Sequence, residues 1–379
     1  MEFRGPSVID CSTPITTQEQ AERFLADAKL LGEKISKRTL VSLQKKNNQV
    51  IDVLTAAYSS EIADREFAGT AIVIPARNEL FVDQTIQSII ANLGNRKNPH
   101  RDVTILVAAN GEDKPVTAKA LRPFLTSNKR KLRLRGIDVV VRNYRVCGKS
   151  AVFDRVLTEF HSRHIIPETL FFIDADVLID PGCFEEMEKL LGQGNVVVGA
   201  MSQSPKPQTI IEAMGSVPFV RVESPTNKHL MIAGRAFAIN TRRGSALFRS
   251  STHAFPGALT EDALFSLIIA DRGIPAALTS TRYLHTNTPS TLSDVLSQAD
   301  RWRKGLQQGV AVSKNPLKIV GGFKLETGWK EWIGAAIYPL LALIDGSRLF
   351  LTFEDMSLGG PLPSIYRARG WESPKRLKQ

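Results

Sequence analysis

Short apolar runs alternate with amphipathic segments from residue 70 onward. Residues 70–74, 103–109, 137–141 and 169–173 have the pattern of buried strands, and residues 82–93 and 149–161 carry apolar side chains at helical spacing. Strands that alternate with helices predict an α/β domain built on a parallel, doubly wound sheet. Ligands of such sheets bind beyond the carboxyl ends of the strands, so residues that follow a strand are candidates for a site.

A helical extension is predicted before this domain. Residues 16–58 repeat apolar side chains at helical intervals, and Thr16 and Glu19 have the spacing of a capping box. The change of pattern predicts a helical N-terminal extension over residues 1–66 and an α/β domain over residues 67–310. A C-terminal helical segment with a basic tail is expected over residues 311–379.

The C-terminal segment comes closest to a membrane-spanning pattern at residues 332–344. This run is shorter than the roughly 20 apolar residues that a spanning helix needs, and it contains Pro339. The surrounding tryptophans and lysines suit amphipathic helices that lie in a membrane interface, while a buried helical hairpin is the alternative. Peripheral attachment to the inner membrane face is the working hypothesis.

Composition narrows the class of protein. Hydrophobic residues make up 43% and charged residues 23% of the 379 residues, which is typical of a globular chain. Lysine and arginine exceed aspartate and glutamate by 49 to 38, and this net charge of +11 favours a phosphate-rich substrate, an anionic membrane face or a polyanion. The few cysteines lack paired spacing and the N-terminus lacks a leader pattern, so we expect a cytoplasmic location.

Basic side chains gather at residues 129–135 and 367–378. Most such runs are merely solvated, but others attract anionic lipid or the phosphates of nucleic acid. All three interpretations stay open from the sequence.

The candidate site residues follow the predicted strands, in segments that are polar and rich in turn-forming residues. They are Pro75, Ala76, Arg77, Asn78 and Glu79 after the first strand, Asn110 after the second, and Asp174 and Asp176 after the fourth. In extended geometry the two aspartates point to one face, where their carboxylates suit Mg²⁺ or Mn²⁺. About one such pair is expected by chance in a chain of this length, so a solvated turn is the alternative.

Two further carboxylates, Glu261 and Asp262, open a predicted helix. Free backbone N–H groups and the helix dipole stabilise acidic residues at such a position, which is one explanation of the pair. The other is that a carboxylate here acts as a general base for an attacking hydroxyl.

Gln298, Arg301 and Trp302 form a Q-x-x-R-W pattern on a predicted helix, where these positions share one face. About 0.01 occurrences are expected by chance, so the pattern is more specific than the aspartate pair. Arginine can bind a diphosphate and tryptophan can stack on a sugar, although a core tryptophan beside a snorkelling arginine is the alternative.

Seven short segments occur in order between residues 69 and 310, namely VIPARNE, ANGED, CGKSAVFDRVL, FFIDADV, AGRAFAI, GALTED and QADRW. In order and spacing they resemble the inverting family 2 glycosyltransferases, the group that includes hyaluronan, chitin and cellulose synthases. The resemblance implies a GT-A fold with a Rossmann-like mixed sheet. It also implies transfer of a sugar from a nucleotide-sugar donor, a UDP-sugar in the first instance, to a glycan or lipid-linked acceptor.

The resemblance also implies roles for the candidate residues. Donor-binding residues would be Pro75, Ala76, Arg77, Asn78, Glu79, Asn110, Lys149, Asp174, Asp176, Gln298, Arg301 and Trp302. Asp176 with Asp174 would hold Mn²⁺ or Mg²⁺, and Asp262 would be the catalytic base beside Glu261. Acceptor-binding residues would be Gly234, Glu261 and Trp302.

One position departs from the family pattern, which usually has an aspartate in the turn after the second strand. This chain has Asn110 there, which can hydrogen-bond a uracil edge but carries no charge.

Three other functions stay open. A DNA-modifying glycosyltransferase would explain the basic clusters, and a non-catalytic interaction module would explain the N-terminal helices. A nucleotidyltransferase shares paired carboxylates and sheet topology, but such enzymes typically carry a Gly-rich basic loop after the first strand, where this chain has residues 75–79.

Overall fold

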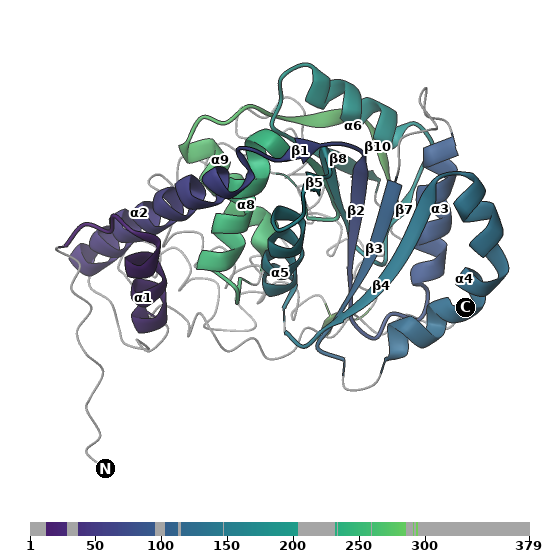
Figure 1. Cartoon of the computed structure of the whole chain (residues 1–379), viewed down its shortest axis with the longest axis horizontal. Coiled ribbons are helices and arrows are strands. Elements are labelled where there is room, and N and C mark those ends of the chain that lie inside the picture. The colour runs from purple at the N-terminus through teal and green to yellow at the C-terminus, as the bar shows by residue number, and fades with distance from the viewer. Residues whose placement is uncertain are drawn as a thin grey trace, which may run out of the picture.

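The computed structural model describes residues 13–28, 37–94, 103–112, 115–146, 148–203, 232, 234–258, 260–285, 291 and 293–294. The main-sheet strands are β2 (Thr70–Ala76), β3 (Val103–Asn110), β4 (Ile137–Tyr144), β6 (Thr169–Ile173), β7 (Leu178–Ile179), β8 (Val197–Gln203), β9 (Ala236–Asn240) and β10 (Ala276–His285). They form an eight-stranded sheet in the order β4-β3-β2-β6-β9-β8-β10-β7 (Figure 1). β1 (Glu66–Phe67) and β5 (Ile165–Ile166) form a separate two-stranded parallel sheet.

Strand direction decides which loops meet. β2, β3, β4 and β6 run parallel to one another, whereas β9 runs antiparallel to both β6 and β8. β10 is parallel to β8 and antiparallel to β7. The carboxyl ends of β2, β3, β4, β6, β8 and β10 therefore share one edge of the sheet with the beginning of β9. The predicted doubly wound α/β fold is confirmed, with two antiparallel strands that make the sheet mixed.

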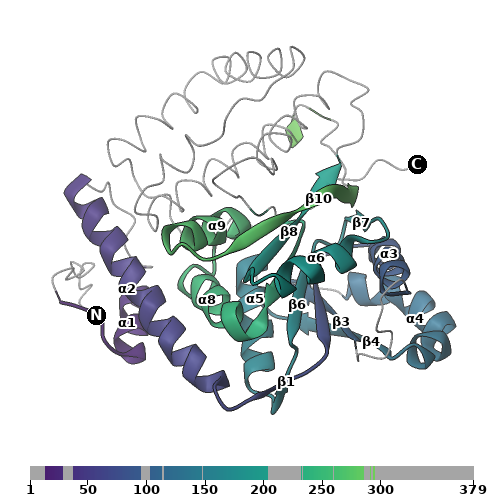
Figure 2. The same cartoon turned by 90° about the horizontal axis from the view of Figure 1, so that it is seen from above.

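Helices cover both faces of the sheet because alternate strand residues point to opposite sides. In β6, Leu170 and Phe172 belong to one apolar cluster, and Phe171 and Ile173 belong to the other. The first cluster includes residues of α5 (Lys149–His161), α8 (Thr241–Ala254) and α9 (Glu261–Asp271). The second includes residues of α3 (Val82–Gly94), α4 (Val116–Leu134) and α6 (Cys183–Gly192). Figure 2 shows α5 and α8 on one side of the sheet and α3 and α4 on the other.

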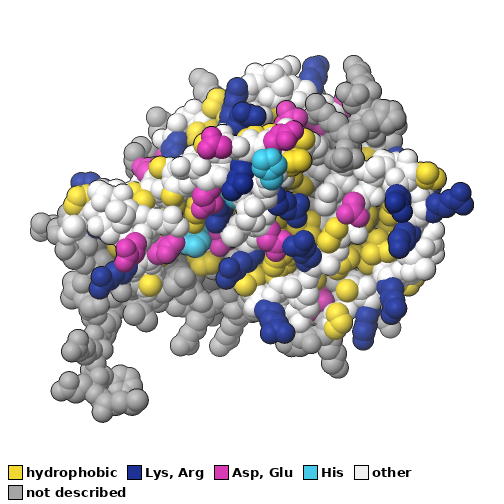
Figure 3. All heavy atoms as spheres, viewed as in Figure 1, with side chains coloured by type: hydrophobic (Ala, Val, Ile, Leu, Met, Phe, Trp, Pro, Cys, Tyr) yellow, Lys and Arg dark blue, Asp and Glu magenta, His cyan; other side chains and the backbone are white. Residues whose placement is uncertain are grey.

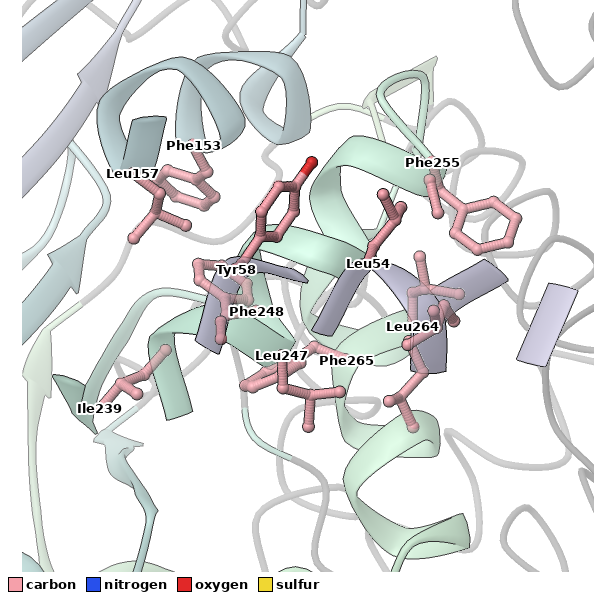
Figure 4. Close-up of a cluster of buried hydrophobic side chains, with 14 of the residues drawn as sticks. Leu54, Tyr58, Phe153, Leu157, Ile239, Leu247, Phe248, Phe255, Leu264 and Phe265 are labelled. Atoms are coloured by element: carbon pink, nitrogen blue, oxygen red, sulfur yellow. The ribbon is translucent and has the colours of Figure 1, made fainter. Parts of the chain in front are cut away.

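The N-terminal helices are α1 (Gln18–Ala28) and α2 (Lys37–Ile62). Leu54 and Tyr58 of α2 belong to the same apolar cluster as Leu247 and Phe248 of α8 (Figure 4). Burial of these side chains joins the extension to the α/β domain, since apolar area removed from water is the main favourable term in folding. The helical prediction for this region is confirmed in the described residues, as two helices.

The capping box of α1 lies one residue later than the sequence predicted. Thr17 Oγ1 accepts the backbone N–H of Gln20 over 3.3 Å, and Gln20 Oε1 accepts the backbone N–H groups of Thr16 and Thr17 over 2.8 and 3.2 Å. The helix begins at Gln18, so Thr17 is the N-cap residue and the expected pair of Thr16 and Glu19 is wrong.

A buried polar contact also joins α2 to the domain. The guanidinium of Arg249 lies 3.8 Å from the ring centroid of Tyr58 and forms an ion pair with Glu61. Arg249 Nη1 donates to His161 Nδ1 over 3.2 Å, so His161 Nε2 carries the proton and donates to Ser245 Oγ over 3.0 Å. This geometry requires a neutral imidazole.

None of the helices in the described ranges has both the length and the apolar character of a membrane span. The amphipathic helices expected at the C-terminus, including residues 332–344, lie outside the described residues.

Candidate active site

Lys149 joins three segments that are far apart in the sequence. Its Nζ lies 2.6 Å from Asp174 Oδ1 and 2.7 Å from Glu261 Oε1, and it donates a hydrogen bond to the carbonyl oxygen of Gly234 over 2.9 Å. The turn after β6 and the start of α9 therefore lie at one place, as the predicted function requires. The contact between Lys149 and Glu261 was not expected from the sequence.

The sheet topology explains this convergence. β6 ends at Ile173 and the antiparallel β9 begins at Ala236, so the residues that flank them share an edge of the sheet. The backbone N–H of Asp174 donates to the carbonyl oxygen of Arg235 over 2.8 Å, which continues the strand pairing into the site. Lys149 is the first residue of α5, and Glu261 is the first residue of α9.

Burial and charge oppose one another at this site. Glu261 has only 7% of its side chain exposed, and Asp174 and Lys149 keep 26% and 23%. Burial raises the pKa of Asp174 to about 7 although Lys149 opposes the shift, and Asp176 raises this pKa further. Burial likewise raises the pKa of Glu261. Burial alone lowers the pKa of Lys149, but the neighbouring carboxylates outweigh it and the net shift is upward.

Four carboxylates make up the acidic cluster, defined as Asp174, Glu261 and Asp262, whose charges act on Lys149, and Asp176, whose charge acts on Asp174. One ammonium cannot neutralise four carboxylates, so the cluster favours an additional positive charge. A proton or a divalent cation would supply it.

Asp262 is held by the backbone of Gly234. The N–H of Gly234 donates to Asp262 Oδ2 over 2.8 Å. A Cβ at position 234 would lie 2.9 Å from both Cβ and Cγ of Asp262, so only glycine fits without displacing the aspartate. On the helix itself, Ser266 Oγ donates to the backbone oxygen of Asp262 over 2.7 Å and accepts the N–H of Ile232 over 2.9 Å.

Asp174 and Asp176 lie in a turn and not on an extended strand. The strand ends at Ile173, and the backbone N–H of Val177 donates to the carbonyl oxygen of Asp174 over 3.3 Å. Thr85 of α3 donates its hydroxyl to the carbonyl oxygen of Ala175 over 2.7 Å, which fixes the turn from the side. The expectation of extended geometry is therefore wrong, because the turn hydrogen bond changes the direction of the chain after Asp174.

The loops after β2 and β3 form a second polar group on the same edge of the sheet. Glu112 Oε1 accepts the backbone N–H of Asn78 over 2.7 Å, and Asn78 has a positive φ of 55°. Glu112 also accepts the N–H and hydroxyl of Thr117, whose Oγ1 accepts the N–H of Glu79 over 3.1 Å. These bonds hold residues 77–79 in a defined shape next to β6.

Asn110 at the end of β3 is buried and donates through Nδ2 to the carbonyl oxygen of Ala76 over 3.1 Å. One N–H of its amide thus serves the neighbouring strand, so in a role toward a base the second N–H and the amide oxygen would remain. Pro75 and Ala76 are the last residues of β2 and are buried.

Residues 68–305 match the model of a family described as glycosyltransferase-like family 2. The chain belongs to this family. The match spans more than half of the chain and confirms the predicted family at that level. The likeness to hyaluronan, chitin and cellulose synthases stays a prediction.

Several solved structures are similar to this family 2 chain at low identity. S. aureus TarS is 11% identical over 66% of this chain with a TM-score of 0.39, and the chain spans 50% of its length. TarS 1-349 in complex with UDP is 13% identical over 74% of this chain and 73% of its own, with a TM-score of 0.40. A third structure is glucosyl-3-phosphoglycerate synthase from Mycobacterium tuberculosis in complex with Mn²⁺, UDP-glucose and phosphoglyceric acid. It is 15% identical over 70% of this chain and 84% of its own, with a TM-score of 0.38. No curated protein matches the sequence.

The structure therefore places the predicted site residues of this glycosyltransferase-like chain in two groups. Lys149, Gly234 and the acidic cluster form one group, and residues 75–79 with Asn110 form the other. Gln298, Arg301 and Trp302 lie outside the described residues. Glu112 belongs to the ANGED segment singled out in the sequence, but its contacts with Asn78 and Thr117 were not predicted. Thr117 and Ser266 also shape the two groups and were not predicted. Of these residues, only Ser266 could have been identified from the sequence, because it lies one helical turn after Asp262.

A divalent cation fits the acidic cluster by chemistry, since hard carboxylate oxygens are what Mg²⁺ and Mn²⁺ prefer. Among the described residues no group of three His, Cys, Asp or Glu side chains forms a metal cage. Mg²⁺ usually keeps several waters and is held by one or two carboxylates together with substrate phosphates. The absence of a cage in the described part is therefore compatible with a cation shared with a diphosphate.

Proposed function

We propose that this family 2 chain transfers a sugar from a UDP-sugar to a hydroxyl of a glycan or lipid-linked acceptor, with inversion at the anomeric carbon. One observation carries the proposal. Lys149 holds the turn of Asp174 against the helix start of Glu261, so the turn that we assign to the nucleotide sugar lies beside the helix that carries the candidate base.

Asp262 is the proposed general base. Its Oδ2 accepts the N–H of Gly234, and we assign the other oxygen, Oδ1, to the acceptor hydroxyl. A carboxylate so oriented can take the proton as the hydroxyl attacks, which typically contributes about 10²–10⁴-fold to the rate. Because one fixed backbone N–H holds the group, little reorganisation is needed at the moment of reaction.

Asp176 with Asp174 would hold Mn²⁺ or Mg²⁺. When bound, such an ion stabilises the negative charge that develops on the departing diphosphate. Lys149 keeps part of the acidic cluster neutralised before a donor binds, because it pairs with Asp174 and Glu261. The charge that the cluster still lacks explains why donor binding would depend on the cation.

The donor and acceptor ends are assigned to the flanking residues. The shaped loop of residues 75–79 and Asn110 would hold the nucleoside, next to β6 on the same edge of the sheet. Gly234 and Glu261 would face the acceptor, together with Trp302. Gln298 and Arg301 would bind the diphosphate, as the family resemblance implies.

The chemistry is a single displacement. The acceptor oxygen attacks the anomeric carbon, the bond to the diphosphate oxygen breaks, and Asp262 takes the hydroxyl proton. The transition state resembles the oxocarbenium ion of glycoside hydrolysis, and no covalent intermediate with the enzyme is needed.

The other functions have less support. Like charges whose pKa values are shifted by burial and by one another are characteristic of functional sites. Asp174 and Glu261 of the acidic cluster have such raised pKa values, which argues against a purely non-catalytic module. The loop after β2 is short and shaped by Glu112, unlike a Gly-rich nucleotidyltransferase loop. A DNA acceptor is the second candidate and ranks lower, because only the positive charge of the chain supports it.

The organisation of the chain is proposed as expected from the sequence. Residues 67–310 would be the catalytic domain, between an N-terminal extension over residues 1–66 and a C-terminal segment over residues 311–379. We place the enzyme in the cytoplasm, peripheral to the inner membrane face.

A screen of nucleotide sugars by thermal unfolding tests the proposal. A donor that saturates the site at about a hundredfold excess over its Kd stabilises the folded state by about 2.7 kcal/mol. We expect this shift only with the matching donor and Mn²⁺ or Mg²⁺ together, and its loss in Asp176→Asn. Asp138→Asn, an exposed position on β4, is the control and should keep the shift. Equal shifts with and without metal, or an unaffected Asp176→Asn, would contradict the assignment.

A further inference from the structure

Helix α4 carries many cations and no carboxylate. Six Lys and Arg side chains between Val116 and Leu134 are exposed, namely Lys119, Arg122, Lys129, Arg130, Lys131 and Arg133. None of them forms an ion pair with any other residue for which the structure gives a position. Uncompensated like charges on one helix repel one another, so this surface favours an anionic partner.

Five of these cations lie on one side of the helix. At about 100° per residue, Lys119, Arg122, Lys129, Arg130 and Arg133 fall within an arc of about 100°, and Lys131 falls about 100° outside it. The five residues are named the cationic stripe. It runs for about 21 Å along the helix, from the rise of about 1.5 Å per residue.

The stripe has a fixed orientation toward solvent. Leu121 and Leu132 lie on another side of α4 and are buried in the apolar cluster that includes β3 and α3. Figures 1 and 2 both show α4 at one edge of the molecule and α1 and α2 at the opposite edge. Figure 3 shows Lys and Arg side chains gathered along that edge.

One apolar side chain stands beside the stripe. Leu134 is 78% exposed, the highest exposure given for a large hydrophobic residue in the described part of the chain. It is the last residue of α4 and stands between Arg133 and Arg135 in the sequence. An apolar side chain next to cations is the composition of a helix that contacts a membrane interface.

We propose that the cationic stripe binds a bilayer surface that displays anionic phospholipid headgroups, with Leu134 entering the interface. Each cation near such a surface contributes through attraction to the headgroups within a Debye length. A nucleic acid would also bind the cations through its phosphates, but its phosphates would give the Leu134 side chain no apolar surface to pack against. The exposed leucine therefore favours the bilayer over the nucleic acid.

The contact orients the site. The beginning of α4 is held to the loops of the active-site edge through Thr117, Glu112 and Glu79. The stripe starts at Lys119, less than one turn farther along the helix. A bilayer on the beginning of the stripe therefore lies beside the loops that the proposed function assigns to the nucleoside of the donor.

Co-sedimentation of the full chain with vesicles tests the proposal. The probes are vesicles of phosphatidylcholine mixed with phosphatidylglycerol and vesicles of phosphatidylcholine alone, at low and high salt. Removing one cation is expected to weaken binding about fivefold, so Arg122→Gln, Lys129→Gln, Arg130→Gln and Arg133→Gln combined should weaken it by far more than tenfold. Leu134→Ser alone should weaken it about tenfold.

A charge-matched control keeps the test specific. It removes four exposed cations from α1, α2, α5 and α6 by Arg23→Gln, Lys45→Gln, Arg155→Gln and Lys189→Gln. This control should retain most of the binding to the anionic vesicles, and thermal unfolding should show that both variants are folded.

Three results would overturn the proposal. The first is no sedimentation of the unaltered chain with anionic vesicles at low salt. The second is equal binding by the stripe variant and the control, which would assign the contact to net charge or to another segment. The third is stripe-dependent binding to duplex DNA without binding to vesicles, which would make the stripe a nucleic-acid surface.

Discussion

The backbone N–H of Gly234 donates to Oδ2 of Asp262 over 2.8 Å, and the carbonyl oxygen of Gly234 accepts from Lys149 over 2.9 Å. One glycine thus contacts both the proposed base and the lysine that holds the acidic cluster together. The absence of a side chain is what allows the approach, since a Cβ here would lie 2.9 Å from the Cβ of Asp262.

Gly234→Ala should therefore lower the rate of transfer more than it lowers stability. The added methyl displaces the Asp262 carboxylate, and a misplaced catalytic group costs on the order of 10²-fold. The measurement is kcat with saturating donor, with donor binding followed separately by calorimetry. Gly192→Ala is the control, since no atom lies within 4 Å of its Cβ position and its activity should not change. Full activity in Gly234→Ala would show that this contact does not position the base.

Asp262→Asn should abolish transfer and leave donor binding nearly intact. The amide oxygen of asparagine can still accept the N–H of Gly234, so the local geometry is preserved, but asparagine cannot take a proton. We expect a loss of about 10²–10⁴-fold in kcat. Single-turnover kinetics and donor titration separate the two effects. Unchanged turnover would remove Asp262 from its role.

Lys149→Met should destabilise the fold. Removing one partner of a buried ion pair typically costs about 3–5 kcal/mol, and the partial exposure of Lys149 and Asp174 puts the expected loss near the lower end, about 3 kcal/mol. Because the loss arises from uncompensated carboxylates, Glu261→Gln in the same chain should recover part of it, with a coupling of about 1–3 kcal/mol.

Chemical unfolding of both single variants and the double variant at neutral pH measures this coupling. Lys189→Met, at an exposed lysine on α6, is the control and should change stability by less than about 0.5 kcal/mol. Strictly additive effects of Lys149→Met and Glu261→Gln would mean that the two side chains do not interact in solution.

The contact of His161 with Arg249 predicts a loss of stability in acid. Burial, together with the positive charge of Arg249, lowers the pKa of His161 from 6.5 to about 3. Since the unfolded chain binds this proton more readily, the stabilising contribution is complete above pH 6.5 and is lost as pH falls from 6.5 toward 3. One such group lowers the free energy of unfolding by about 2 kcal/mol between pH 6.5 and pH 5.

His161→Gln is the matched variant, because glutamine can still accept from Arg249 and donate to Ser245. Its unfolding free energy, measured in urea across this pH range, should depend on pH less steeply than that of the unaltered chain. If the two slopes agree, His161 titrates normally in the folded state.

Much of the fold was predictable from patterns that repeat. Alternating apolar strands and amphipathic helices predicted the doubly wound sheet, and carboxylates at strand and helix ends predicted where Asp174 and Asp262 lie. These predictions succeed because burial acts on whole segments. The antiparallel direction of β9 was not predicted, since an apolar run has the same pattern in either direction.

Details set by single contacts were less predictable. The turn after Asp174 depends on Thr85 and on a backbone hydrogen bond, and neither leaves a pattern in the sequence. The pairing of Lys149 with Glu261 arises because the first residues of α5 and α9 lie side by side in the fold, although they are far apart in the sequence. In the sequence, the only sign of the close approach of Gly234 to Asp262 is a glycine shortly before a strand.

The most direct test of the proposed activity is the identity of the nucleotide product. The full chain is incubated with a panel of UDP-sugars, acceptor extracts and Mn²⁺, and UDP and pyrophosphate are quantified together. We predict UDP release that disappears on chelation of the metal and falls at least about 100-fold in Asp262→Asn. Release of pyrophosphate, or UDP release that Asp262→Asn leaves unchanged, would contradict a glycosyltransferase site built on the acidic cluster.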